Sequence, residues 1–161
     1  MKKLLLFLLV PLISFSQEQI SEEQVINHIN EFFSALNIKN YNKERLREKV
    51  TDDFIIFEMG KQFTLDEFTD YIESAGFLGW ESTEWVLSDF KVSIDSNSAH
   101  VSYLNSGTFI YPNPYKGKIF LREDKKWLES VYIVLEENDL KIKFLQSDDI
   151  YSNISVYRKS S

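Results

Sequence analysis

The sequence predicts one α+β domain in which a curved antiparallel sheet carries a long N-terminal helix and two shorter helices on one face. Its 161 residues suit a single domain, and no internal repeat or linker divides them. Apolar residues recur at helical spacing early in the chain and alternate with polar residues later. Helices followed by a run of strands favour a sheet that carries its helices on one face.

The start of the chain has the features of a signal peptide. Lys2-Lys3 precedes an apolar stretch from Leu4 to Ile13, and Ser14-Phe15-Ser16 resembles a cleavage site with small residues. A stretch this short favours a cleaved signal over a membrane span, although an uncleaved anchor is the alternative. We therefore expect an exported protein, periplasmic or secreted. The predicted segments are a signal peptide at 1–16, the folded domain at 17–150 and a C-terminal tail at 151–161.

Composition excludes several classes of function. The chain has no cysteine, which rules out a cysteine-linked lipid anchor and thiolate metal sites, and its net charge is −7. This acidic balance argues against binding to nucleic acid or to anionic membranes. Two histidines on separate elements give no metal-ligand spacing, and no phosphate-binding glycine loop or nucleophile elbow is present. We expect no metal and no cofactor.

Two capping signatures mark the start of the predicted helices. Ser21-Glu22-Glu23-Gln24 precedes an apolar stripe that predicts a long helix ending near Asn37 to Asn40. Thr64-Leu65-Asp66-Glu67 precedes a second amphipathic stripe and predicts another helix. A short polar helix is expected over residues 42–48, and a first strand over residues 53–59.

Two hairpins set the expected register of the later strands. Ser96-Asn97 joins one pair of alternating runs, and Asn138-Asp139 joins the other. Even-length loops at these turns give eight pairs on the core face. In the first hairpin these are Ile94 with Ala99, Val92 with Val101, Phe90 with Tyr103 and Ser88 with Asn105. In the second they are Leu135 with Ile142, Ile133 with Phe144, Val131 with Gln146 and Glu129 with Asp148.

This register makes the core face apolar near the turns and polar at the far end. Trp127, Glu129, Gln146 and Asp148 are expected to gather there. On the opposite face, six apolar residues point away from the core, and such a patch is typical of a contact surface. These residues are Trp85, Leu87, Leu104, Tyr132, Val134 and Leu145. They predict a homodimer interface or another protein-interaction surface.

Two stretches resemble the nuclear transport factor 2-like superfamily, of the SnoaL-like kind. They are Trp127-Leu128-Glu129-Ser130 and the strand from Leu140 to Ser147. The resemblance covers about Glu22 to Asp148 and implies a cone in which a sheet wraps a helix around a pocket. It also implies dimerisation through the outer side of the sheet. Family members include isomerases, dehydratases, polyketide cyclases and binding subunits, so the resemblance does not choose a function.

This sequence departs from the family pattern in its last strand. Leu140 stands where members often have tryptophan, and Gln146 stands where they often have histidine. A histidine there would be a general base near neutral pH, whereas a glutamine only forms hydrogen bonds. This departure favours binding over catalysis.

Two carboxylates are the candidates for chemistry. Opposed across two strands, Glu129 and Asp148 would have Cβ atoms about 5 Å apart. In a partly apolar pocket, one pKa would rise and the pair would supply an acid and a base. The resemblance to a ketosteroid isomerase of this superfamily implies that Tyr103 acts as an oxyanion donor. The alternative is that both carboxylates are solvated at the open end of the sheet.

The high aromatic content predicts a small apolar pocket beyond what core packing needs. Aromatic walls with a few polar anchors suit a small, mostly apolar ligand. The predicted lining is Phe57, Trp80, Tyr103 and Trp127, with Asn105, Glu129 and Gln146 as polar anchors. The leading hypothesis is an exported small-molecule-binding or accessory domain. The alternatives are a cofactor-free isomerase or lyase, and a protein-interaction module that uses the outer face.

Overall fold

A computed structural model describes residues 20–116 and 119–158. The predicted signal peptide at 1–16 lies outside this range. The helices are α1 (Glu22–Leu36), α2 (Lys43–Arg47), α3 (Leu65–Ser74) and the short 3₁₀ helix η1 (Phe77–Gly79). The strands are β1 (Val50–Glu58), β2 (Lys61–Phe63), β3 (Ser82–Ile94), β4 (Ser98–Pro112), β5 (Phe120–Glu136) and β6 (Asp139–Tyr157). No helix in this part of the chain is long and apolar enough to cross a membrane.

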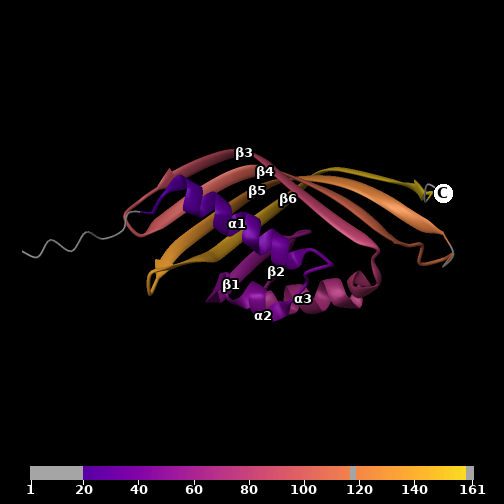
Figure 1. The fold of residues 1–161 in the computed structure, drawn as a ribbon, viewed down its shortest axis with the longest axis horizontal. Helices are drawn as coiled ribbons and strands as arrows, with labels where there is room; N and C mark the ends of the chain where they lie inside the picture. The colour runs from indigo at the N-terminus through magenta and orange to yellow at the C-terminus, as the bar shows by residue number, and fades with distance from the viewer. Residues whose placement is uncertain (1–19, 117–118, 159–161) are drawn as a thin grey trace, which may run out of the picture.

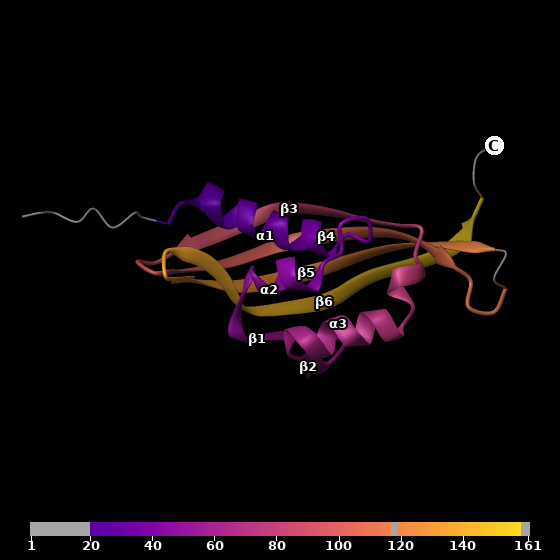
Figure 2. The same cartoon turned by 60° about the horizontal axis from the view of Figure 1, so that its bottom comes forward.

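The strands form one curved sheet, and the predicted α+β fold is confirmed. The strand order is β2-β1-β6-β5-β4-β3, with β1 parallel to β6 and the other neighbours antiparallel. Figure 1 shows the helices under the arch of the sheet, with α1 crossing beneath the long strands. Figure 2 shows α1 on the side of β3 and β4, and α3 beside β1 and β2. The helices therefore cover only the inner face of the sheet.

Both predicted caps are present at the helix starts. The Ser21 hydroxyl accepts from the Gln24 amide at 3.2 Å, and the Gln24 side chain accepts from the Ser21 amide at 2.9 Å. Thr64 and Glu67 form the same reciprocal pair at α3. Such pairs satisfy amide groups that have no partner within the helix. They fix where α1 and α3 begin.

The β3–β4 hairpin keeps the predicted register near its turn and changes it further along. Ile94 pairs with Ala99 and Lys91 pairs with Ser102, as expected, but Leu87 then pairs with Asn105. An extra residue at Asp89, whose φ is 58°, shifts the register. Side chains beyond this bulge exchange faces, because faces alternate with every residue. Trp85 and Leu87, predicted to lie outside, therefore face the core.

The β5–β6 hairpin differs in a similar way. Its turn is Glu137-Asn138, with φ of 52° and 73°, so Leu135 pairs with Leu140 rather than Ile142. This two-residue difference leaves the same side chains on the core face. A second irregularity between Tyr132 and Ile133 then shifts the register by one residue. The turn already makes the predicted pair of Ile133 wrong, and beyond the shift the predicted pairs of Val131 and Glu129 are wrong as well.

The one-residue shift between Tyr132 and Ile133 decides which side chains of β6 point to the inner face of the sheet. Leu145 and Ser147 are buried on the inner face, whereas Gln146 and Asp148 are exposed. Glu129 pairs with Ser147 instead of Asp148. The strand also continues beyond the predicted domain end, and Tyr157 pairs with Phe120. Residues 151–157 therefore belong to β6, which corrects the expectation of a tail from residue 151.

Candidate functional site

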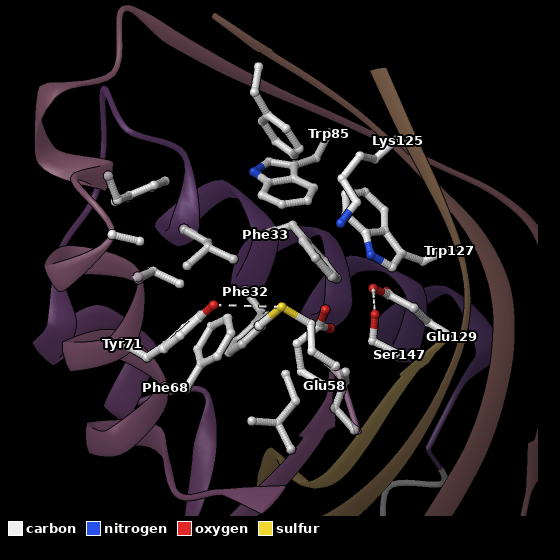
Figure 3. A pocket seen from close by; sticks show the side chains of 18 of the residues that line it. Phe32, Phe33, Glu58, Phe68, Tyr71, Trp85, Lys125, Trp127, Glu129 and Ser147 are labelled. Atoms are coloured by element: carbon white, nitrogen blue, oxygen red, sulfur yellow. Dashed lines mark hydrogen bonds between the residues drawn. The ribbon is translucent and has the colours of Figure 1, made fainter. Parts of the chain in front are cut away.

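A pocket of about 310 Å³ lies between the helices and the half of the sheet far from the β5–β6 turn. Its walls come from α1, β1, α3, η1 and the inner face of β3 to β6. Nine aromatic side chains line it: Phe32, Phe33, Phe68, Tyr71, Phe77, Trp80, Trp85, Phe109 and Trp127. Figure 3 shows several of these rings surrounding the open space. Phe32 and Phe33 of α1 border the pocket and do not fill it.

Glu129 is the deepest ionisable group of the pocket and is only 6% exposed. The Ser147 hydroxyl donates to its Oε1 at 3.2 Å, and the Asn105 amide donates to the same oxygen at 3.1 Å. Its other oxygen, Oε2, has no hydrogen-bond partner. Figure 3 shows Glu129 and Ser147 joined at the pocket wall. One carboxyl oxygen is thus held in place by two donors, whereas the other is buried without a hydrogen bond.

Burial raises the pKa of the Glu129 carboxyl from 4.5 to about 7. Tyr103, Asn105 and Ser147 oppose this rise because they stabilise the charged form, whereas the nearby Glu58 carboxylate adds to it. Glu129 therefore exchanges its proton near neutral pH. A group of this kind is suited to general acid–base chemistry.

Tyr103 of β4 lies beside Glu129 of β5, with which it pairs, and does not line the pocket. Its ring packs beside Phe33 and Phe90, with centroid distances of 6.4 and 5.3 Å. Its hydroxyl has no hydrogen bond of normal geometry. Burial raises the pKa of this phenol well above its usual value, and the Glu129 charge adds to the rise. Tyr103 is therefore a neighbour of the carboxyl group and not a donor to a ligand.

Two indole groups supply donors that the sequence did not single out for that role. The Nε1 atoms of Trp85 and Trp127 are buried and have no hydrogen-bond partner among the described residues. Their ring centroids are 5.7 Å apart. Both residues line the pocket. Buried donors without partners are costly in a native structure, so a hydrogen-bond acceptor is expected beside them.

Gly107 shapes this aromatic wall. A Cβ atom at Gly107 would lie 2.5 Å from Cζ of Phe109 and 2.8 Å from Cζ3 of Trp127. These distances are too short for any side chain at this position without movement of both rings. The absence of a side chain thus lets Phe109 and Trp127 lie over the strand.

The other charged groups of the lining are Glu58 of β1 and Glu123 and Lys125 of β5. Burial raises the pKa of Glu58, and the Asp149 charge adds to the rise. Lys125 forms an ion pair with Asp149 at 3.0 Å, and its ammonium lies 5.0 Å from the centre of the Trp127 ring. The Tyr111 hydroxyl donates to Glu123 at 3.0 Å. The pocket therefore carries three carboxyl groups and one ammonium group.

The structure brings together only part of the predicted site. Trp80, Trp127 and Glu129 line the pocket, and Asn105 and Tyr103 lie beside Glu129 on the neighbouring strand β4. The remaining three predicted residues do not reach it. Phe57 is 40% exposed and packs on Phe144 on the other face of the sheet, with ring centroids 5.1 Å apart. Gln146 and Asp148 are exposed beside each other, which corrects their predicted placement.

Sequence reasoning missed the helical wall and Glu58. The helical wall consists of residues from the apolar stripes of the two predicted helices, and such a stripe indicates packing on a sheet without indicating a cavity. These residues are Phe32, Phe33, Phe68 and Tyr71. Glu58 continues the alternation of Phe54 and Ile56, both of which are buried. That alternation was the signal that could have placed its carboxyl group on the inner face.

The predicted contact surface is also divided by the bulges. Trp85 lines the pocket, Leu87 packs against the core and Leu145 is buried in it. Of the six residues, Leu104, Tyr132 and Val134 remain on the outer face. The predicted interface therefore keeps half of its residues.

A metal site finds no support in the part of the chain that the structure describes. No group of three or more His, Cys, Asp or Glu side chains there is arranged to hold a metal ion. The carboxyl groups of the pocket are spread over β1 and β5, with Lys125 between Glu123 and Glu129 along β5.

No protein-family model and no curated protein sequence matches this chain. Solved structures do match its fold. A protein from Novosphingobium aromaticivorans described as a candidate scytalone dehydratase has 13% identity and a TM-score of 0.63, covering 86% of this chain and 89% of its own. The association domain of CaMKII from C. elegans has 11% identity and a TM-score of 0.59, covering 78% and 93%.

A third structure carries the name of the superfamily that the sequence resembles. It is a nuclear transport factor 2-like protein from Cytophaga hutchinsonii, with 18% identity and a TM-score of 0.56. The match covers 81% of this chain and 100% of that protein. Identities this low show the fold and not the activity. The curved sheet, the enclosed helix and these matches together show that the chain has the cone-shaped nuclear transport factor 2-like fold.

Proposed function

We propose that this protein binds a small, mostly apolar molecule in the pocket, with Glu129 as its polar anchor. The observation that carries the proposal is a pocket of about 310 Å³ with aromatic walls and a buried carboxyl oxygen that has no partner. Ligand sites are typically concave and apolar, with a few polar groups that fix orientation. The size and chemistry of this pocket fit that description.

The unpartnered groups support a ligand over a purely structural role. Trp85 Nε1, Trp127 Nε1 and Glu129 Oε2 lie at one pocket and are all buried without partners. A structural core would fill such a space with apolar side chains, because each unsatisfied buried polar group costs about 1–3 kcal/mol. A molecule with an apolar body and one or two polar atoms would satisfy these groups.

Indole signals offer a direct test of binding. The chain has three tryptophans, and Trp80, Trp85 and Trp127 all line the pocket. Titration with 4-phenyl-1-butanol, followed by ¹H–¹⁵N NMR, should shift all three indole N–H signals in a saturable way. Ala75→Phe narrows the pocket and should weaken this binding, whereas Leu128→Phe on the outer face should not. Equal effects of both variants would overturn the proposal, and so would unchanged indole signals with this alcohol and with the amine and carboxylate of the same phenylalkyl body.

Catalysis by proton transfer is the second candidate function. The observation that favours it is the Glu129 pKa of about 7 in an enclosed pocket. As a base, Glu129 would take a proton from the carbon next to a ligand carbonyl, and the C–H electrons would move onto the carbonyl oxygen. An indole N–H, rather than the predicted Tyr103, would donate to that oxygen. Returning the proton to another carbon completes an isomerisation, and loss of a β-substituent completes an elimination.

The titration of Glu129 tests this second function without a known substrate. A ¹³C NMR titration of the side-chain carboxyl, assigned with Glu129→Gln, should give a midpoint near neutral pH. A midpoint near pH 4.5 would overturn this second function, since it would remove the raised pKa that favours Glu129 as its acid and base. The binding proposal would survive that result, because it needs only the pocket.

Interaction through the outer face and export remain further proposals. Leu104, Tyr132 and Val134 lie on the exposed side of the sheet and support a homodimer contact. The molecular mass by sedimentation at micromolar concentration decides this. The proposal of export depends on the signal-peptide features of residues 1–16. Sequencing the N-terminus of the mature protein tests it, because cleavage after Ser16 would make Gln17 the first residue.

A further inference from the structure

The pocket carries more negative than positive groups. Glu58, Glu123 and Glu129 line it together with one cation, Lys125. That cation is already matched, because its ammonium lies 3.0 Å from the Asp149 carboxylate. The charge of Lys125 also opposes the rise of the Glu58 pKa, so one cation shared with Asp149 faces three carboxyl groups of the pocket.

None of the three carboxyl groups forms an ion pair within the described residues. Glu123 accepts hydrogen bonds from Tyr111 at 3.0 Å and from Ser152 at 3.2 Å. Across residues 20–116 and 119–158, no lysine, arginine or histidine nitrogen forms an ion pair with Glu58 or Glu129. Glu129 is buried, and its Oε2 atom has no hydrogen-bond partner. Buried carboxylates without a partner favour a positive charge brought by a ligand.

The aromatic walls favour the same charge. The faces of indole, phenol and phenyl rings are electron-rich and attract ammonium groups within about 6 Å of the ring centre. Lys125 shows this contact within the molecule, since its ammonium lies 5.0 Å from the centre of the Trp127 ring. A pocket with nine aromatic side chains and three carboxyl groups that form no ion pair resembles a site for an organic cation more than one for an anion.

We infer that the molecule bound in this pocket is an amine: an apolar body, about the size of one or two rings, that carries an ammonium group. The ammonium donates to Glu129 Oε2 and lies near the Glu58 carboxylate, while the apolar body packs against Phe32, Phe33 and Phe68. This inference rests on the proposed function, because it names the class of ligand for the same pocket.

Proton linkage gives the inference a distinct signature. The groups that act on Glu129 are Tyr103 and Asn105 from β4, Glu58 from β1 and Ser147 from β6. Of the charged groups, Lys125 and Asp149 neutralise each other. Burial holds the Glu129 pKa at about 7, so this carboxyl must lose its proton when an ammonium binds beside it. Amine affinity should therefore rise with pH up to about 7 and then level off, while the ammonium stays charged.

Three matched probes separate charge from shape. They are 4-phenylbutylamine, 4-phenyl-1-butanol and 4-phenylbutyrate, which share the same phenylalkyl body and differ in their end group. At pH 8, calorimetry should show the amine binding at least about tenfold more tightly than the alcohol, with the carboxylate weakest. Alcohol affinity should stay constant between about pH 6 and pH 8, whereas amine affinity should increase.

Two variants and one control complete the test. Glu129→Gln keeps the shape of the side chain and should remove most of the advantage of the amine, with the alcohol affected by less than about threefold. Glu58→Gln should reduce amine binding to a smaller extent. Glu136→Gln replaces an exposed carboxylate outside the pocket and should change neither affinity.

The outcomes distinguish the inference from the proposed function. Alcohol binding equal to or tighter than amine binding would overturn the amine class and leave the pocket as a ligand site. An advantage of the amine that survives in Glu129→Gln would also overturn it, because the charge would then be recognised elsewhere. Failure of all three probes to shift the tryptophan signals would remove both proposals.

Discussion

The two halves of the inner sheet face are made from the same strands but are filled differently. Near the turns, Ala99 pairs with Ile133 and Val101 pairs with Val131, and all four are buried in the core beneath α1. This half contains only apolar side chains at its centre. It has the composition expected of a core that stabilises the fold.

The far half continues the same ladder with other chemistry. Tyr103 pairs with Glu129, Asn105 pairs with Trp127, and Gly107 pairs with Lys125. Here the space above the sheet is a pocket, and several buried polar atoms lack partners. The difference indicates that the near half stabilises the domain, whereas the far half contributes less stability because it keeps the pocket open.

The largest expected effect is in the filled half. Ile133 is fully buried, and Ile133→Ala should lower the free energy of unfolding by about 2–5 kcal/mol, because it removes packed atoms and leaves a cavity. Leu128, on the other face of the same strand, is 54% exposed, and Leu128→Ala should cost less than about 0.5 kcal/mol. Urea unfolding measures both. Similar losses in the two variants would contradict the assignment of the near half as the stabilising core.

The next effect concerns the buried carboxyl of the far half. The folded-state pKa of Glu129 is raised, so its stabilising contribution is complete below pH 4.5 and is lost as pH rises through about 7. Relative to Glu129→Gln, the free energy of unfolding of the wild type should fall by up to about 3 kcal/mol between about pH 5 and pH 8.

Urea unfolding at several pH values measures this difference. Glu136→Gln is the control, because this exposed side chain should leave the pH profile unchanged. Parallel pH profiles for wild type and Glu129→Gln would mean that water reaches the carboxyl group as freely in the folded as in the unfolded chain. The two halves of the inner sheet face would then not differ in how they exclude water.

A smaller effect is expected at the glycine under the aromatic wall. Gly107→Ala forces Phe109 and Trp127 to move and should cost about 1–3 kcal/mol. It should also shift the Trp127 indole N–H signal. Gly79→Ala is the matched control, since no atom lies within 4 Å of a Cβ placed there. Equal stability of the two variants would show that the wall adapts freely, and the pocket would then not be preformed.

Local signals made part of this structure predictable. Ser21 with Gln24 and Thr64 with Glu67 identified both helix starts, because capping depends on residues only three positions apart. Alternation identified β3 to β6 as strands, and it placed Glu129 correctly on the inner face. Trp80 and Trp127 also lie at the pocket, as predicted.

The errors begin where a strand contains an extra residue. Counting from each turn predicts the facing side chains only until a bulge, after which every side chain changes face. The bulge at Asp89 turns Trp85 inward. The shift between Tyr132 and Ile133 turns Leu145 inward and Gln146 outward. Nothing in the local pattern marks these positions, because a bulge is favoured by the curvature of the whole sheet.

The amino-acid sequence by itself determined the α+β class, the helix starts and the apolar half of the sheet, because each depends on neighbouring residues and regular spacing. Only the tertiary structure decided which polar groups share the pocket. The parallel pairing of β1 with β6 brings Glu58 to the same pocket as Glu129, although the two residues are far apart in the chain. The bulges in β3 and β6 decide which of their side chains face the pocket. Bulges accompany the curvature of the sheet, which is a property of the assembled fold.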